Sequence, residues 1–239
     1  MRIIAIVPAY NEEEALPGTL KELRKSAPDL DVVVVSDGSV DATADVARSE
    51  GAIVLELPYN LGIGGALRTG FRYAFAEGYD AAVQFDADGQ HDPAQIGELV
   101  RGLESGANMV VGSRFTSTSA HYEVSGTRRS AMRLLQVAVR LISGRSYTDT
   151  SSGFRAFDRS VLEFFSRNYP SEYMESVESL IVATLEGFDV VEVPVSMRQR
   201  SAGEPSNRRF RLIYHYLRLL LVLGARVRRR PRSQFEGAT

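Results

Sequence analysis

Residues 82–93 read AVQFDADGQHDP and join an apolar run to a dense cluster of polar groups. The apolar residues up to Phe85 indicate a buried strand, and the strand pattern stops abruptly at Asp86. Like charges this close are stable only when a cation or many hydrogen-bond donors lie among them. Because oxygen ligands suit hard divalent ions, the stretch predicts a Mg²⁺ or Mn²⁺ site for a phosphate-bearing ligand. The predicted metal ligands are Asp86, Asp88 and Gln90.

The end of this stretch has a structural interpretation of its own. Asp92 is followed by a proline, and this pair is typical of a helix N-cap and first helical residue. We therefore expect a helix to begin here, which leaves the predicted metal ligands unexplained by capping. His91 is either a metal ligand or neighbour of the metal site, or a residue of the turn.

The remainder of the chain alternates strand and helix patterns. Alternation at this spacing predicts an α/β fold, in which helices cover both faces of an open, mostly parallel sheet. The expected strands span residues 3–7, 31–35, 52–57, 81–85, 109–111, 154–157 and 190–195. The expected helices include one ending near residue 26 and others over residues 41–48, 63–76, 93–103, 128–142 and 176–185.

Polar residues follow the carboxyl ends of four expected strands, at 8–12, 37–39, 86–90 and 113–114. Ligands of open parallel sheets bind beyond these ends, so we predict one site at this edge. Asp37 either accepts a hydrogen bond from a nucleobase N–H or ties the following turn. Residues 60–65, NLGIGG, predict a tight turn into a helix, because they lack the glycine spacing and lysine of the common phosphate loops.

Length and charge restrict the organisation of the chain. Its 239 residues fit one large domain, and the absence of cysteine excludes disulfides and thiolate metal sites. The N-terminal residues read as a strand rather than a signal peptide, so we expect a cytoplasmic protein. Residues 1–207 hold 19 basic and 29 acidic residues, a net charge of −10, whereas residues 208–239 hold nine arginines and one acid, a net charge of +8.

The basic C-terminal segment, residues 207–239, contains an amphipathic helical pattern. Its longest charge-free run, residues 219–225, is far shorter than the roughly twenty residues needed to span a bilayer. Two interpretations remain open. The helix binds an anionic membrane surface, where apolar burial and headgroup charge both favour it, or it packs on the domain or on a partner.

Seven motifs, in order, resemble those of family 2 glycosyltransferases. They are VPAYNE (7–12), DGSVDAT (37–43), NLGIGGA (60–66), DADGQHDP (86–93), GSRF (112–115), SGFR (152–155) and EVPV (192–195). The chain looks most like the dolichyl-phosphate mannose synthase branch, over residues 3–206. The resemblance implies an A-type nucleotide-diphospho-sugar transferase fold, a nucleotide-diphosphate sugar donor and inversion at the anomeric carbon. It also implies a catalytic domain over residues 1–206, followed by the amphipathic segment 207–239.

The resemblance assigns roles to individual residues. The metal bridging the donor diphosphate would lie on the three ligands predicted above, with Arg200 near the same diphosphate. Arg114 and one of Arg128 or Arg129, with Arg129 preferred, would bind an acceptor phosphate. For a hydroxyl acceptor, Asp149 or Glu178 would be the general base. The nucleotide would be held by Pro8, Tyr10, Glu12, Asp37, Asp86 and Ala87.

The resemblance implies a metal-dependent, inverting hexosyltransferase that uses GDP- or UDP-hexose at the inner membrane face. The expected acceptor is a polyprenyl phosphate, and the alternative is a sugar hydroxyl of a lipid-linked or surface glycan. A third interpretation is a binding module that has lost turnover. We expect peripheral membrane contact through residues 208–232, no nucleic-acid partner, and either a membrane-protein partner or a homo-oligomer.

Overall fold

The computed structural model describes residues 1–116, 126–170 and 175–198. For residues 126–132 and 134 it describes the backbone alone. The predicted C-terminal helix and the predicted domain boundary at residue 206 lie outside the described residues, and both stay predictions.

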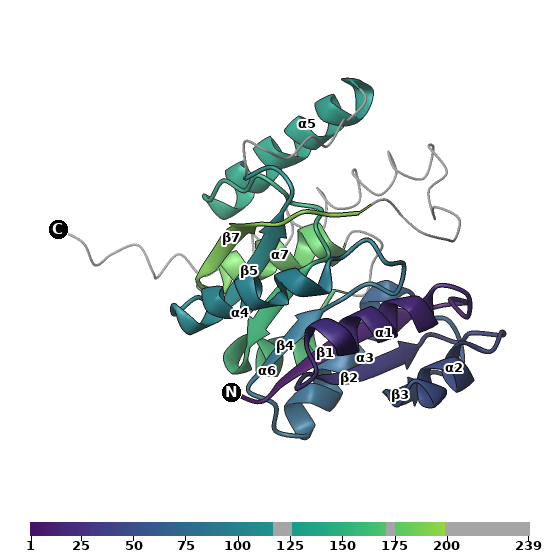
Figure 1. Cartoon of the computed structure of the whole chain (residues 1–239). Coiled ribbons are helices and arrows are strands. Elements are labelled where there is room, and N and C mark those ends of the chain that lie inside the picture. The colour runs from purple at the N-terminus through teal and green to yellow at the C-terminus, as the bar shows by residue number, and fades with distance from the viewer. Residues whose placement is uncertain (117–125, 171–174, 199–239) are drawn as a thin grey trace.

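Seven strands form one sheet in the order β3-β2-β1-β4-β6-β5-β7 (Figure 1). β6 runs antiparallel to both of its neighbours, β4 and β5, while the other pairings are parallel. The bounds are β1 Ile3–Ala9, β2 Asp31–Ser36, β3 Ile53–Glu56, β4 Ala81–Gln84, β5 Met109–Ser113, β6 Arg155–Asp158 and β7 Val190–Pro194. The predicted mostly parallel sheet is thus confirmed, with β6 as the reversed strand.

Helices cover both faces of the sheet, so the apolar residues of the central strands are buried on both sides. On β1, Ile4 and Ile6 enter one core, and Ala5 and Val7 enter the other. This explains why the central strands are continuous apolar runs rather than alternating ones. The helices are α1 Leu16–Ser26, α2 Thr43–Ser49, α3 Ile63–Ala76, α4 Ile96–Glu104, α5 Gly126–Ser143, α6 Arg159–Asn168 and α7 Glu175–Leu185, with a 3₁₀ turn, Pro93–Gln95, before α4.

The first core lies under α3, α5, α6 and α7, and the second lies under α1, α2 and α4. The sequence pattern as interpreted above does not include α6. Asp158 accepts a hydrogen bond from the backbone N–H of Val161 at 2.8 Å and so caps this helix. Within the described ranges, no helix has both the length and the hydropathy required to cross a bilayer.

Candidate active site

The carboxyl ends of β1, β2, β4 and β5 share one edge of the sheet, because these strands run parallel to one another (Figure 1). The loops that leave this edge carry most of the residues predicted from sequence. The topology therefore brings these loops to one edge of the sheet, as the sequence predicted. The side chains of each loop are held differently, and their partners define what each can do.

The loops after β1 and β2 are tied to each other. The backbone N–H of Glu12 donates to Thr43 Oγ1 at 2.9 Å, and that of Val40 donates to Asn11 Oδ1 at 2.9 Å. Asn11 has a positive φ of 53°, which turns the chain sharply after β1. Tyr10, on this turn, is 48% exposed, so its ring can stack on a planar ligand. Pro8, also predicted to hold the nucleotide, lies within β1.

Asp37 is buried just beyond β2 and holds the neighbouring glycine-rich turn. Its Oδ1 accepts a hydrogen bond from the N–H of Leu61 at 2.7 Å. Burial raises the pKa of Asp37, while hydrogen bonds from Leu61 and Gly62 oppose that rise. A Cβ at Gly38, whose φ is +69°, would lie 2.5 Å from the backbone nitrogen of Asn60, so this approach requires glycine. Asp37 thus ties the glycine-rich turn before α3 rather than the turn that follows it in sequence, and its contact with a nucleobase stays a prediction.

The turn that follows β4 is ordered by its own side chains. Asp88 is 6% exposed, and its Oδ1 accepts a hydrogen bond from the N–H of Gln90 at 3.0 Å. The side chain of Ala87 is buried in the core, and its carbonyl accepts a hydrogen bond from Thr19 Oγ1 at 2.8 Å. Ala87 therefore fixes the backbone of the turn, and any nucleotide contact would involve its main chain.

The predicted helix cap at Asp92 is confirmed. Its Oδ1 accepts a hydrogen bond from the N–H of Ala94 at 3.1 Å, and Pro93 occupies the first position of the turn. The same Oδ1 lies 3.1 Å from Arg198 Nη2, which joins the segment after β7 to this turn. Asp92 is thus a structural member of the acidic cluster.

His91 holds Asp86 in position through two contacts. Its Nδ1 accepts a hydrogen bond from the N–H of Asp86 at 3.0 Å, and its Nε2 lies 3.5 Å from Asp86 Oδ2. The ring stacks on Phe154 at 4.7 Å between centroids and is only 3% exposed. These contacts show that His91 positions Asp86, and metal binding through Nε2 stays a prediction.

The protonation of His91 reflects this burial. Burial lowers its pKa, whereas the charges of Asp86 and Asp88 act to raise it and that of Arg114 acts to lower it. A neutral ring is required for Nδ1 to accept the hydrogen bond described above. The three charges that influence this ring belong to the loops after β4 and β5.

Arg114, beyond β5, is held by Asp149 in a two-point ion pair. Arg114 Nε lies 2.7 Å from Asp149 Oδ2, and Nη2 lies 2.8 Å from Oδ1. Asp149 is fully buried, which acts to raise its pKa, but the hydrogen bonds and charge of Arg114 outweigh burial and lower it. Nη2 also donates to Ser151 at 2.9 Å. This geometry makes Asp149 a positioning partner of Arg114 and a weak proton acceptor at neutral pH.

Glu192, in the last of the motifs, holds the loop that carries Asp149. Its carboxylate accepts hydrogen bonds from the N–H of Thr148 at 2.8 Å and from that of Asp149 at 2.8 Å. β7 therefore contributes to the site by fixing this loop. The motif alone gave no indication of this role.

Two buried charged residues close to the site, Arg155 and Glu175, were not predicted from the sequence. Arg155 on β6 is fully buried, and its Nη1 donates to Ser179 Oγ at 2.8 Å. Burial lowers the pKa of Arg155, while the charges of Glu175, Asp149 and Asp86 oppose this change. Burial also raises the pKa of Glu175. Arg155 thus places a positive charge beneath carboxylates of the site; its only sequence signal was its place in the SGFR motif.

The oxygen-bearing side chains of the turn after β4 suit a metal ion that also binds a phosphate-bearing ligand. Asp86, Asp88 and Gln90 offer hard oxygen donors, whereas Nδ1 of His91 is engaged by the N–H of Asp86. No group of three or more His, Asp or Glu side chains with the geometry of a metal cage occurs among the described residues. Such a set fits Mg²⁺ or Mn²⁺ that takes its other ligands from a diphosphate and water.

Four predicted residues are not placed at the site. Arg200 lies outside the described residues, and Arg128 and Arg129 lie in the part of α5 of which only the backbone is described. Glu178 is buried on α7, at 6% exposure. Their predicted roles stay predictions.

The sheet order and its edge site define an A-type nucleotide-diphospho-sugar transferase fold. The chain is similar to the crystal structure of glucosyl-3-phosphoglycerate synthase from Mycobacterium tuberculosis in complex with Mn²⁺, UDP and phosphoglyceric acid. The TM-score is 0.70 at 22% identity, covering 97% of this chain and 80% of that one. At this identity the similarity concerns the fold.

Sequence comparisons identify the family. Residues 4–165 match the family described as Glycosyl transferase family 2. The chain is 34% identical over 211 residues to undecaprenyl-phosphate mannosyltransferase from Micrococcus luteus, covering 85% of this chain and 86% of the relative. It is 29% identical over 243 residues to UDP-N-acetylglucosamine–dolichyl-phosphate N-acetylglucosaminyltransferase from Methanococcus voltae, covering 93% of this chain and 96% of the relative. The chain therefore belongs to glycosyl transferase family 2 and is a nucleotide-sugar-dependent transferase, as its motifs implied.

Proposed function

We propose that this enzyme moves a hexose from GDP- or UDP-hexose to a polyprenyl phosphate, with inversion and with Mg²⁺ or Mn²⁺. The observation that carries the proposal is the Arg114–Asp149 ion pair at the sheet edge that also holds Asp86 and Asp88. A guanidinium held at this edge supports the binding of a phosphate group close to the expected diphosphate. The relatives named above support the acceptor class, since their names include undecaprenyl phosphate and dolichyl phosphate.

The donor would lie across the loops after β1, β2 and β4. Tyr10 offers an exposed ring to the base, and Asp37 keeps the adjoining glycine-rich turn in place. Asp86, Asp88 and Gln90 would hold the metal, which when bound neutralises charge developing on the departing nucleotide diphosphate. His91 keeps Asp86 oriented for that task.

The acceptor is argued from Arg114 and its partner. A guanidinium suits the oxygens of a phosphate, and Asp149 prevents the Arg114 side chain from adopting other rotamers. A phosphate acceptor is already an anion at neutral pH and needs no strong general base. The lowered pKa of Asp149 supports this acceptor over a sugar hydroxyl, which would require a base.

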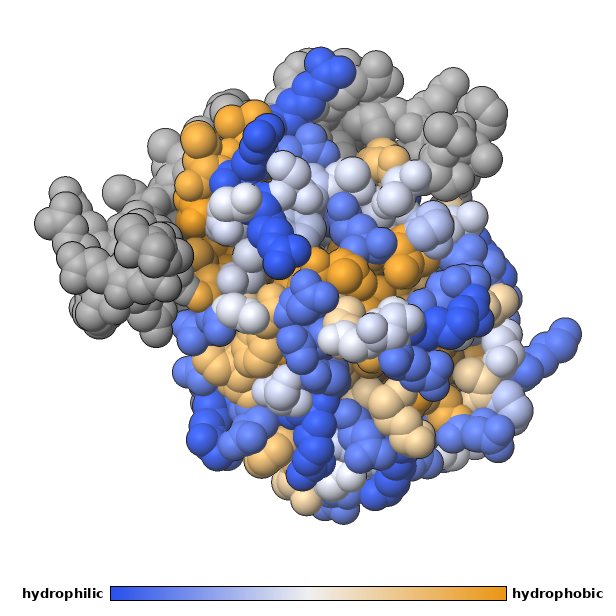
Figure 2. Space-filling model, turned by 90° about the vertical axis from the view of Figure 1, so that its left-hand side faces the viewer, coloured by the Kyte–Doolittle hydropathy of each residue, from blue (hydrophilic) through white to orange (hydrophobic). Residues whose placement is uncertain are grey.

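Peripheral contact with the cytoplasmic membrane face completes the proposal. Figure 2 shows apolar surface beside hydrophilic side chains at the top of the molecule, where α5 lies. On α5, Val137 is 54% and Leu141 is 80% exposed, and Arg133 and Arg140 are exposed on the same helix. A basic helix with exposed aliphatic residues suits an anionic membrane surface. Residues 208–232, the contact predicted from sequence, lie outside the described residues.

The direct test is a transfer assay with a panel of radiolabelled GDP- and UDP-hexoses. Each donor is offered undecaprenyl phosphate, unphosphorylated undecaprenol or a lipid-linked glycan, with Mn²⁺ or with EDTA. We expect product with the phosphate alone and loss of product in EDTA. Transfer to the glycan but not to the phosphate would show that the acceptor is a sugar hydroxyl and contradict the proposed acceptor. Undiminished transfer in EDTA would show that the reaction does not need a metal ion.

A further inference from the structure

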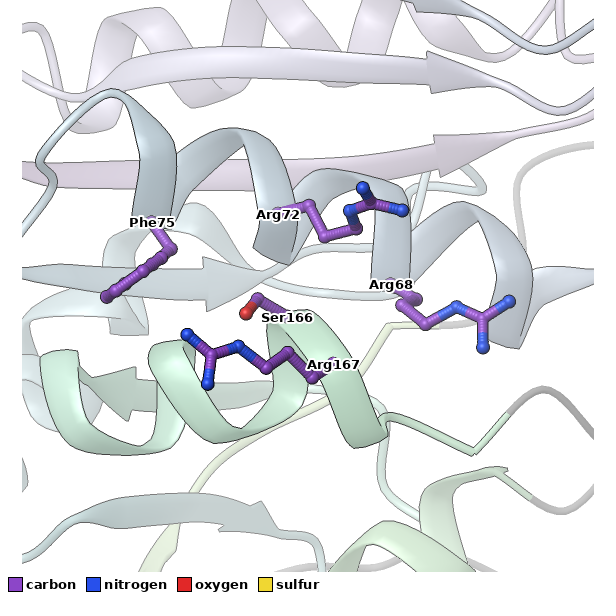
Figure 3. A pocket seen from close by; sticks show the side chains of 5 residues that line it. All are labelled: Arg68, Arg72, Phe75, Ser166 and Arg167. Atoms are coloured by element: carbon purple, nitrogen blue, oxygen red, sulfur yellow. The ribbon is translucent and has the colours of Figure 1, made fainter.

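A groove of about 560 Å³ lies between α3 and α6, on helices rather than at the sheet edge. Arg68, Arg72 and Phe75 line it from α3, and Ser166 and Arg167 line it from α6. In Figure 3 the guanidinium groups of Arg68 and Arg72 lie toward one end, and Phe75 lies at the other. None of the residues assigned above to the donor, acceptor or metal lines this groove.

Positive charge in this groove is not balanced by neighbouring acids. Arg68 and Arg72 are four residues apart on one helix, a spacing at which like charges destabilise a helix. In the described part of the chain, neither of them makes an ion pair or a side-chain hydrogen bond. Arg167 lies 3.5 Å from Glu163, but both side chains are more than half exposed, so this pair offsets little of its charge. The concentration of charge is notable because residues 1–207 carry a net charge of −10.

Aromatic contacts between α3 and the end of α6 support the groove from below. Beneath it, the rings of Phe71 and Tyr169 lie 4.9 Å apart, and those of Phe165 and Tyr169 lie 5.0 Å apart. Ser166 donates its hydroxyl proton to the carbonyl of Glu163 at 2.7 Å, so its oxygen can only accept a further hydrogen bond. The groove thus presents Arg68 and Arg72 toward one end, the guanidinium of Arg167 on the side of Phe75, and the Ser166 oxygen as an acceptor (Figure 3).

We propose that the α3–α6 groove is a second anion site, which binds a phosphate group carried by a larger molecule. Guanidinium groups match the oxygens of a phosphate through paired, charge-assisted hydrogen bonds. Ser166 accepts from a hydroxyl of the ligand, and Phe75 contacts its apolar part. The ligand is either a soluble phosphorylated small molecule or the headgroup of an anionic lipid. The site is independent of the proposed function, since it shares no residue with the sheet edge.

The test compares the wild-type protein with Arg68→Gln/Arg72→Gln and with Arg167→Gln. One arm titrates glycerol 3-phosphate and inorganic phosphate by calorimetry, and the other measures co-sedimentation with vesicles of phosphatidylglycerol or phosphatidylcholine. Arg24→Gln/Arg101→Gln removes the same charge from α1 and α4 and serves as the matched control. The sheet-edge site is common to all four proteins, so differences among them report on the groove.

We expect binding in at least one arm to be weakened at least about tenfold in the double variant, and less in Arg167→Gln, with the control unchanged. Loss confined to the soluble phosphates identifies a soluble ligand, and loss confined to phosphatidylglycerol vesicles identifies a lipid headgroup. Equal binding by the wild type and the double variant in both arms overturns the proposal. An equal decrease in the matched control also overturns it, because net charge would then account for the effect.

Discussion

Asp88 and Asp92 belong to one turn but have different partners. Asp88 accepts a hydrogen bond from the N–H of Gln90 within the turn, whereas Asp92 caps the 3₁₀ turn that follows. In Asp88→Asn the amide oxygen can still accept from Gln90, so the fold should persist while the charge needed for the metal is lost. We predict that calorimetry with UDP and GDP in Mn²⁺ detects no metal-dependent binding by this variant. Asp92→Asn is the matched control, since Asn caps helices well, and it should bind as the wild type does. Wild-type affinity in Asp88→Asn would refute the metal role.

Asp149 should make the stability of the enzyme depend on pH at the acidic end. Its pKa is lowered in the folded state, so its contribution is complete above the unfolded pKa near 3.8 and is lost as pH falls through the lower folded value. Asp149→Asn leaves the largely buried Arg114 side chain, 12% exposed, without its counter-charge, and we predict a loss of about 3 kcal/mol of stability at neutral pH. Urea denaturation at several pH values should show this difference shrinking below about pH 4. A difference that is constant with pH would contradict the role of the ion pair.

For individual residues, the sequence predicted which side chains carry charge at the site better than it predicted their hydrogen-bond partners. It placed Asp37 and Asp86 at strand exits because apolar runs end there, and it named Asp149 only through the family resemblance. It left Asp37 and His91 with two interpretations each, because their partners, Leu61 and the main chain of Asp86, are chosen by packing between loops. The possible base role of Asp149 depended on its charge, and its contact with Arg114 appears only in the fold.

Among the elements, α3 packs on β1 through a glycine. A Cβ at Gly70 would lie 2.3 Å from Ile6 Cγ2, so this helix approaches the sheet closely only without a side chain there. We predict that Gly70→Ala lowers the free energy of unfolding by about 1–3 kcal/mol. Gly97→Ala on α4 is the control, because its Cβ would meet nothing closer than 3.6 Å, and it should raise stability by up to about 1 kcal/mol. Equal midpoints of urea denaturation for the two variants would show that the close approach does not constrain the helix.

The strands with long apolar runs were predictable because they are buried on both faces. β6 spans only Arg155–Asp158, and its direction is set by pairing with β4 and β5, which are distant in sequence. Periodicity carries no information about strand direction. α6 was more accessible to sequence reasoning, since a capping Asp158 precedes apolar residues at helical spacing, Val161, Leu162 and Phe165.

For the whole molecule, the opposite charges of the body and the C-terminal segment lead to a prediction about membranes. Deleting residues 208–239 removes a net charge of +8 and should abolish sedimentation with anionic liposomes. Binding of the full chain should fall as salt is raised, because screening weakens headgroup attraction. Neutral liposomes serve as the control. If the truncated protein still sediments fully with anionic liposomes, the attachment lies elsewhere, and α5 with its exposed Leu141 becomes the segment to vary.

The reversed strand β6 also has a consequence for synthesis of the chain. β4 and β5 follow one another in sequence but lie on either side of β6, which emerges from the ribosome after both. Until residue 158 has been made, β4 and β5 each present an edge with unpaired hydrogen-bonding groups, of the kind that invites pairing with other chains. The nascent protein therefore passes through a stage open to aggregation, which ends only after β6 has inserted between β4 and β5 and β7 has paired with the other edge of β5.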